Sequence, residues 1–131
     1  MIADSSFLIA LFHKDDELHQ KAVELFANLP ESSIIVPDRM LEESFTVFSY
    51  KLGAEFALAF LEKLRINKSF VTYRIAESEW DETVKLASSM RKKMSFADYL
   101  AICLSKKTGE EILTFDRQVA SAAKEFRRKQ D

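Results

Sequence analysis

The stretch Met1-Ile2-Ala3-Asp4-Ser5-Ser6 decides how the rest of the chain is interpreted. A short apolar run that ends on an acid and two hydroxyl residues is typical of a buried strand. Asp4 would then stand at the carboxyl end of that strand. Ligands bind at this edge of open α/β sheets, so a parallel sheet would place Asp4 in a functional position.

Length and composition indicate one globular domain over residues 1–131. Hydrophobic residues make up 47% of the chain and charged residues 31%, with only 2 Gly and 2 Pro. This balance favours a helix-rich fold with short loops over a disordered or all-β chain.

The charge is nearly balanced, with 21 acids against 19 bases and a net charge of -2. A protein that coats nucleic acid non-specifically would be strongly basic, although a nucleic-acid substrate is not excluded. Cys103 is the single cysteine, which excludes a disulfide framework and fits a reducing cytoplasm. No signal peptide or apolar run of about 20 residues is present, so we expect a soluble cytoplasmic protein without membrane contact.

Strand-like and helix-like segments alternate along the chain, which predicts an α/β fold with a parallel sheet covered on both faces. The expected strands are residues 1–3, Ser33–Pro37, Ser69–Tyr73 and Glu111–Phe115. The expected helices are Phe7–Phe12, one from about Asp15 to Leu29, Asp38–Leu52, Ala54–Leu64, Glu77–Arg91, Ser95–Lys107 and one after Asp116. The helical period turns inward Phe56, Ala59, Phe60 and Leu64, and places Trp80, Val84 and Ala87 on one face.

Among the acids, Glu43 is the least easily explained by structure alone. Neighbouring Glu42 shares a polar helix row with Thr46, where a solvated charge is expected. Glu43 instead lies on a row with Met40 and Val47. A carboxylate among apolar neighbours is unfavourable unless it is paired or bound to a metal, so a functional role is favoured.

Three other acids have structural explanations that compete with a functional one. Asp4 and Asp116 follow strands, where either could cap the next helix. Ser95-x-x-Asp98 matches a capping box, in which the acid bonds back to the cap's N–H. Thr114 and Asp116 lie on the same side of their strand and can point together toward its open end.

These four acids nevertheless share one edge of the predicted sheet. Closely packed carboxylates raise one another's pKa unless a cation neutralises them. Oxygen-only ligands select a hard ion, so Mg²⁺ or Mn²⁺ is expected rather than zinc. Such an ion can polarise a phosphodiester and activate a bound water.

Four segments in this order are similar to motifs of the PIN-domain ribonucleases, and especially of the VapC-like toxins of prokaryotic toxin–antitoxin pairs. Together they cover nearly the whole chain. The segments are Ile2-Ala3-Asp4-Ser5-Ser6-Phe7-Leu8-Ile9, Met40-Leu41-Glu42-Glu43-Ser44-Phe45, Phe96-Ala97-Asp98-Tyr99-Leu100-Ala101 and Leu113-Thr114-Phe115-Asp116-Arg117.

The resemblance implies a three-layer α/β/α sandwich around a parallel sheet of four to five short strands. It also implies a metal-dependent endoribonuclease that leaves 5′-phosphate and 3′-hydroxyl ends, a homodimer, and a small antitoxin whose tail occupies the active-site groove. Ser6 and Thr114 would support the catalytic acids. The catalytic and metal-binding residues would be the acidic quartet Asp4, Glu43, Asp98 and Asp116. Unlike many relatives, the segment 117–131 has no final apolar strand.

Other functions fit less well. A phosphatase with a nucleophilic Asp4 would need a second acid at the position of Ser6, and no glycine-rich nucleotide motif exists. The alternative that stays open is a PIN-like scaffold that binds RNA or protein without cutting it. Four mutually repelling carboxylates have no purpose in such a scaffold, which favours the nuclease. The 11 Phe residues are interpreted as core or dimer surface, because stacking on RNA requires exposed rings.

Overall fold

A computed structural model describes residues 1–130, with side chains up to Arg128. Each strand of this part of the chain is followed by one or two helices. They are β1 (Ile2–Ala3), α1 (Ser5–Phe12), α2 (His19–Ala27), β2 (Ile34–Pro37), α3 (Asp38–Leu52), α4 (Ala54–Ile66), β3 (Phe70–Tyr73), α5 (Glu77–Met90), α6 (Phe96–Thr108), β4 (Ile112–Leu113) and α7 (Arg117–Gln130).

The four strands of the described chain form one sheet in the order β3-β2-β1-β4, and every neighbouring pair is parallel. Ile2 of β1 is opposite Ile35 on one side and Ile112 on the other, while Ile34 is opposite Phe70. The carboxyl ends of all four strands therefore face the same edge. This confirms the predicted α/β class.

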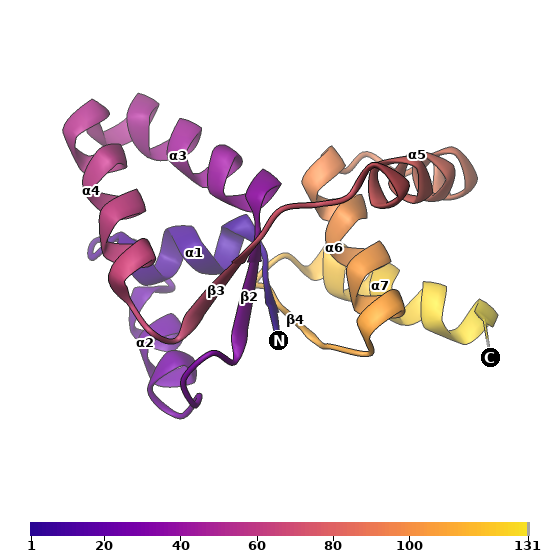
Figure 1. The fold of residues 1–131 in the computed structure, drawn as a ribbon, viewed down its shortest axis with the longest axis horizontal. Helices are drawn as coiled ribbons and strands as arrows, with labels where there is room; N and C mark the ends of the chain where they lie inside the picture. The colour runs from indigo at the N-terminus through magenta and orange to yellow at the C-terminus, as the bar shows by residue number, and fades with distance from the viewer. Residues whose placement is uncertain (131) are drawn as a thin grey trace.

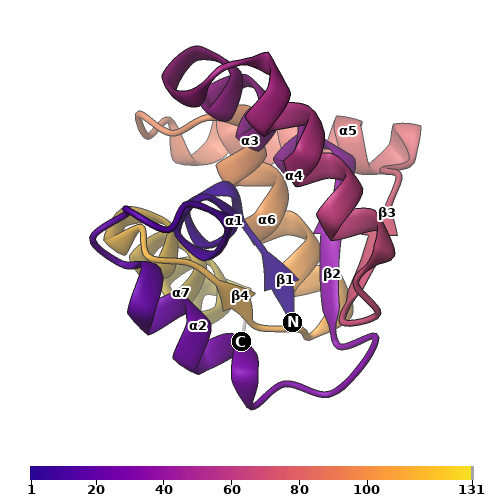
Figure 2. The same cartoon turned by 90° about the vertical axis from the view of Figure 1, so that its left-hand side faces the viewer.

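Helices cover both faces of the sheet (Figure 1). Helices α1 to α4 lie on one side and α5 to α7 on the other, so the predicted three-layer sandwich is confirmed. Figure 2, with the α1–α4 layer toward the viewer, shows α6 behind β1.

The core forms where β1 meets its covering helices. Ile2 and Ala3 are both fully buried, as are Leu8 of α1 and Leu100 of α6. Burying a large aliphatic side chain contributes about 1.5–3 kcal/mol, so these central contacts hold β1 firmly in place. No helix among the described residues is long and apolar enough to cross a membrane.

Two helix predictions need correction. Helix α2 begins at His19 rather than near Asp15, because Asp16 Oδ1 accepts the Leu18 N–H at 2.8 Å and makes a turn instead. In α4 the buried small residue is Ala57, and Ala59 faces solvent.

Helix α5 faces inward on a different side from the one that apolar periodicity indicates. Trp80 and Val84 are 41% and 46% exposed, whereas Glu79, Thr83 and Leu86 are buried. A carboxylate at a buried position is possible because partners from other elements satisfy it, and helical spacing alone carries no sign of such partners.

Strand β4 is shorter than predicted, since it ends at Leu113 rather than Phe115. Beyond that point the backbone bonds to side chains instead of a neighbouring strand. Phe115 N–H donates to Ser6 Oγ at 2.9 Å, and Asp116 N–H donates to Thr114 Oγ1 at 3.0 Å. The chain thereby turns over the carboxyl end of β1, next to Asp4.

Candidate active site

Asp4 lies at the carboxyl end of β1 and caps helix α1, as its simpler interpretation predicted. Its Oδ1 accepts the Phe7 N–H at 3.0 Å and the Ser6 hydroxyl at 2.7 Å. Only 2% of Asp4 is exposed. Burial raises the pKa of Asp4; hydrogen bonds from Thr114, Ser6 and the Phe7 N–H oppose this effect without cancelling it.

Ser6 and Thr114 link the ends of β1 and β4. The Ser6 hydroxyl donates to Asp4, accepts from the Phe115 N–H and lies 3.3 Å from Thr114 Oγ1. Thr114 in turn accepts from the Asp116 N–H. The two hydroxyls therefore connect Asp4 and the backbone of Asp116 in one hydrogen-bond network. The supporting role that the resemblance implies for them stays a prediction.

Glu43 reaches the same place from helix α3. It is half-buried, and the Ser5 hydroxyl donates a hydrogen bond to its Oε1. Glu42 is exposed and pairs with Arg39 at 3.0 Å. Of the two neighbouring acids, Glu43 and not Glu42 faces the strand end that carries Asp4, as the helix rows indicate. The assignment of Glu43 as a ligand stays a prediction.

Asp98 stands in the first turn of α6 and forms the predicted capping box. Its Oδ2 accepts the Ser95 N–H at 3.2 Å, and its own N–H donates to Ser95 Oγ at 3.1 Å. The pKa of Asp98 is raised to about 6, chiefly by burial and against the lowering effect of the Ser95 N–H. Negative charge on Glu43, Asp116 and Asp4 contributes to this rise.

Asp116 caps the last helix. Its Oδ1 accepts the N–H groups of Gln118 at 2.8 Å and Val119 at 3.3 Å. Its charge contributes to the raised pKa of the buried Asp4 and of the half-buried Asp98. Capping and membership of a charged cluster thus coexist at Asp116.

The acidic quartet at the carboxyl edge of the sheet carries negative charge that no neighbouring base of the described chain neutralises. Among the described side chains, no Lys or Arg forms an ion pair with any member of the acidic quartet. The hydrogen-bond partners of the quartet are hydroxyl and backbone N–H groups. Such neutral donors stabilise a carboxylate less than a cation does, so the charge of Asp116 still contributes to the raised pKa of Asp4 and of Asp98.

The residues fit a hard divalent cation in donor type and in charge, since all are oxygen donors and none is neutralised by a base. They are not arranged as a complete ligand shell. Within the described chain, no three acids, histidines or cysteines lie close enough together to hold an ion directly. The assignment of the quartet as metal ligands and catalytic residues therefore stays a prediction.

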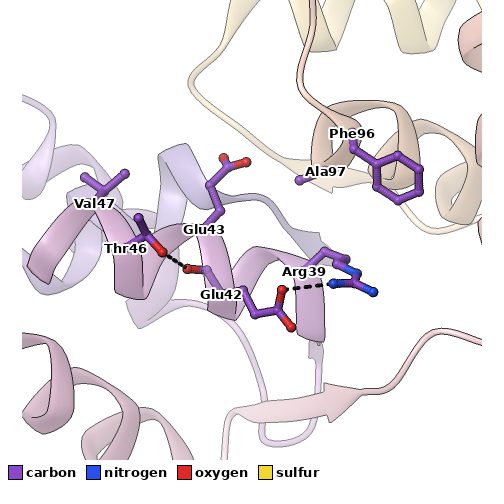
Figure 3. A pocket seen from close by; sticks show the side chains of 7 residues that line it. All are labelled: Arg39, Glu42, Glu43, Thr46, Val47, Phe96 and Ala97. Carbon is purple, nitrogen blue, oxygen red and sulfur yellow. Dashed lines mark hydrogen bonds and ion pairs between the residues drawn. The ribbon is translucent and has the colours of Figure 1, made fainter.

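A cavity of about 390 Å³ opens beside Glu43 (Figure 3). Its walls come from α3 and from the start of α6, and Figure 3 shows the Glu43 carboxylate pointing into the space between these helices. Phe96 and Ala97, just before Asp98, form the opposite wall. Of the acidic quartet, Glu43 lines this cavity.

Ser5, Arg39 and Phe96 were not among the site residues predicted from the sequence. Ser5 could have been suspected from the two adjacent hydroxyl residues after Asp4. One of them, Ser5, contacts Glu43 of α3, and the other, Ser6, contacts Thr114 after β4. No comparable signal marks Arg39 and Phe96, since their proximity arises only from the packing of α3 against α6.

Comparisons with known proteins agree with this architecture. The structure is similar to the crystal structure of Mycobacterium tuberculosis VapC20, described as a sarcin–ricin loop cleaving toxin, with a TM-score of 0.82 and 21% identity over 92% of this chain and 93% of that one. It is also similar to FitAcB from Neisseria gonorrhoeae, with a TM-score of 0.68 and 14% identity over 94% and 92% of the two chains. At these identities the likeness concerns the fold.

Comparison with curated protein sequences gave no match. The family model of the PIN domain, by contrast, matches residues 1–125, which is nearly the entire chain. The parallel sheet, the acids at its carboxyl edge and this match agree, and the chain belongs to the PIN domain family.

Proposed function

We propose that this chain, as one PIN domain over residues 1–131, is a metal-dependent endoribonuclease. The observation that carries the proposal is the state of Asp98. Its pKa is raised to about 6 by burial and by the charges of the other three acids. A fold does not need such repulsion, whereas a site that binds a divalent cation uses it.

The quartet would hold Mg²⁺ or Mn²⁺, with Ser6 and Thr114 fixing the orientation of Asp4 through the hydroxyl web. When bound, such an ion would polarise the phosphodiester and increase the acidity of a bound water. Ser5 keeps Glu43 directed to the same edge. Because the pKa of Asp98 is raised to about 6, this carboxyl is partly protonated at pH 6 in the absence of a cation, and cation binding at that pH would release the proton.

The biological setting is proposed on similarity. VapC20, to which the fold is similar, is described as a toxin that cleaves the sarcin–ricin loop. We therefore extend the proposal to RNA as the substrate, to a toxin role with a small antitoxin protein as partner, and to action in the cytoplasm as a homodimer. The PIN fold and the uncompensated acids support the nuclease; the antitoxin and the dimer rest on the resemblance alone.

Cleavage of a mixed pool of structured RNAs tests the proposal. Purified protein would be incubated with Mn²⁺, with Mg²⁺ and with EDTA, beside the variants Asp4→Asn and Asp98→Asn. The expected result is cutting that requires metal, that both variants lose, and that leaves 5′-phosphate ends. Absence of cutting with either ion, with an unchanged melting temperature on adding metal, would contradict the nuclease and favour a binding scaffold.

A further inference from the structure

A second cavity, of about 470 Å³, lies among α5, α6 and α7, the helices that cover one face of the sheet (Figure 1). It shares no lining residue with the cavity beside Glu43. Small-molecule sites typically enclose about 300–1,000 Å³ and combine apolar walls with a few polar groups. The second cavity is therefore large enough to hold a small molecule.

The walls of this cavity are apolar on all three helices. Leu86 of α5, Cys103 of α6 and Phe126 of α7 line it. Leu86 is buried in the smaller of the two hydrophobic clusters, whereas Cys103 and Phe126 are half-buried at the edge of that cluster. The edge of the cluster thus keeps apolar surface that faces the cavity, and an apolar ligand group could cover it.

Three lysines line the same cavity, against one acid, Glu82. Lys107 has a partner, since its Nζ lies 3.3 Å from Glu79 Oε2. Lys85 and Lys106 form no ion pair among the described side chains, and Lys106 is half-buried in the last turn of α6. An ammonium group that is partly removed from water without a counter-charge is unfavourable. An anion bound in the cavity would supply that counter-charge.

We propose that this cavity binds a small amphiphilic anion, a molecule with one carboxylate and one apolar chain. The chain would contact Leu86 and Phe126, and the carboxylate would pair with Lys106. A purely apolar ligand would leave this lysine without a counter-charge, and a purely polar anion would leave the apolar walls uncovered. The site contains no member of the acidic quartet, so the inference does not depend on the proposed nuclease function.

Octanoate is a suitable probe, because Cys103 can report on its binding. Cys103 is the only cysteine of the chain, so alkylation of the protein by iodoacetamide reads one wall of this cavity alone. We expect saturating octanoate to slow the alkylation in EDTA. Octanol, which lacks the charge, and acetate, which lacks the chain, should have little effect at the same concentration. An unchanged rate with octanoate, or equal slowing by octanol, would overturn the proposal.

Isothermal titration calorimetry measures the contribution of the apolar chain. From hexanoate to octanoate the affinity should rise roughly tenfold, the ratio that corresponds to burying two further methylene groups. An affinity that does not depend on chain length would show that the apolar walls take no part, and would overturn the proposal.

A lysine variant measures the contribution of the charge. We expect Lys106→Gln to weaken octanoate binding roughly tenfold, in line with the loss of a hydrogen bond to a charged group. This variant breaks no ion pair among the described side chains, so it should fold normally. Lys63→Gln makes the same change at an exposed position of α4, in the opposite layer, and is the matched control. Wild-type affinity in Lys106→Gln would overturn the proposal.

These measurements need neither metal nor RNA, which separates them from the test of the nuclease. Octanoate binding in a protein that cuts no RNA would sustain the anion site while the proposed nuclease fails. RNA cleavage by a protein that binds neither hexanoate nor octanoate would have the reverse meaning. It would overturn the anion site and leave the cavity as a contact surface for a protein.

Discussion

Glu79 and the acidic quartet both have carboxylates that are shielded from water, but the pKa of Glu79 is lowered whereas those of Asp4 and Asp98 are raised. Glu79 is 2% exposed, yet it accepts the Tyr73 hydroxyl at 2.6 Å, the Ala76 N–H at 2.7 Å and Lys107 Nζ at 3.3 Å. Burial acts to raise the pKa of Glu79, but these partners outweigh it and hold the pKa below its usual value. The same contact raises the pKa of the Tyr73 hydroxyl to about 12.

At Asp4 and Asp98 of the quartet, the effect of burial on the pKa outweighs the effect of the hydrogen-bond partners. Asp4 is also 2% exposed, but its donors among the described residues are neutral groups, and its pKa is raised, as is that of Asp98. The first carboxylate is a structural link between β3, α5 and α6, whereas the second set keeps negative charge that the protein leaves uncompensated. Compensation, rather than burial alone, distinguishes a structural acid from a candidate functional one.

Replacing one acid of each kind by its amide should separate activity from structure most strongly. We expect Asp4→Asn to lower the rate of metal-dependent RNA cleavage on the order of 10²–10³-fold, as is typical when a group that stabilises the transition state is lost. Glu79→Gln is the matched control and should cut at nearly the wild-type rate, because it lies outside the site. Single-turnover assays measure both rates. Comparable losses in the two variants would contradict the distinction between a structural acid and a functional one.

Glu79 should matter more for stability than any quartet member. Glu79→Ala leaves the Tyr73 hydroxyl, the Ala76 N–H and Lys107 without their acceptor. We expect a loss of about 3 kcal/mol in the free energy of unfolding, the usual cost of breaking a buried charged pair. Urea unfolding followed by circular dichroism measures this loss, and a change below about 1 kcal/mol would place Glu79 among ordinary surface pairs.

Substitution of Asp98 should change the free energy of unfolding in the opposite direction. A folded-state pKa of about 6 favours the protonated acid, so this group's contribution to stability is full below its unfolded pKa and is lost as the pH rises through 6. In EDTA at pH 7.5, Asp98→Asn should therefore stabilise the protein by about 1 kcal/mol, after allowance for solvent screening. The gain should vanish near pH 4, and urea titrations at both values check it. A loss of stability in Asp98→Asn at pH 7.5 would contradict the raised pKa of Asp98.

Much of the fold follows from local pattern. Strand-like runs that end in Asp4 and before Asp116 predict the parallel sheet. Their hydrophobic pattern and the short loops between elements involve only residues that are close in sequence. The Ser95-x-x-Asp98 capping box is equally local and is present as expected. The acids at the carboxyl edge could be found in this way.

Features that depend on distant partners could not be found. The buried position of Glu79 depends on Lys107, 28 residues away, and the bond from Ser5 to Glu43 spans 38 residues. Periodicity assigned Trp80 rather than Glu79 to the apolar face of α5, because no local signal shows that a carboxylate has partners. The cavity between Glu43 and Phe96 likewise exists only after α3 and α6 pack together.

The most direct test of the uncompensated charge is the melting temperature of the protein at pH 7.5 with and without millimolar Mn²⁺. Wild type and Glu79→Gln should both be stabilised by several degrees through mass action, while Asp98→Asn should respond much less. No shift in wild type, or an equal shift in Asp98→Asn, would contradict the claim that the acidic quartet holds its charge for a divalent cation.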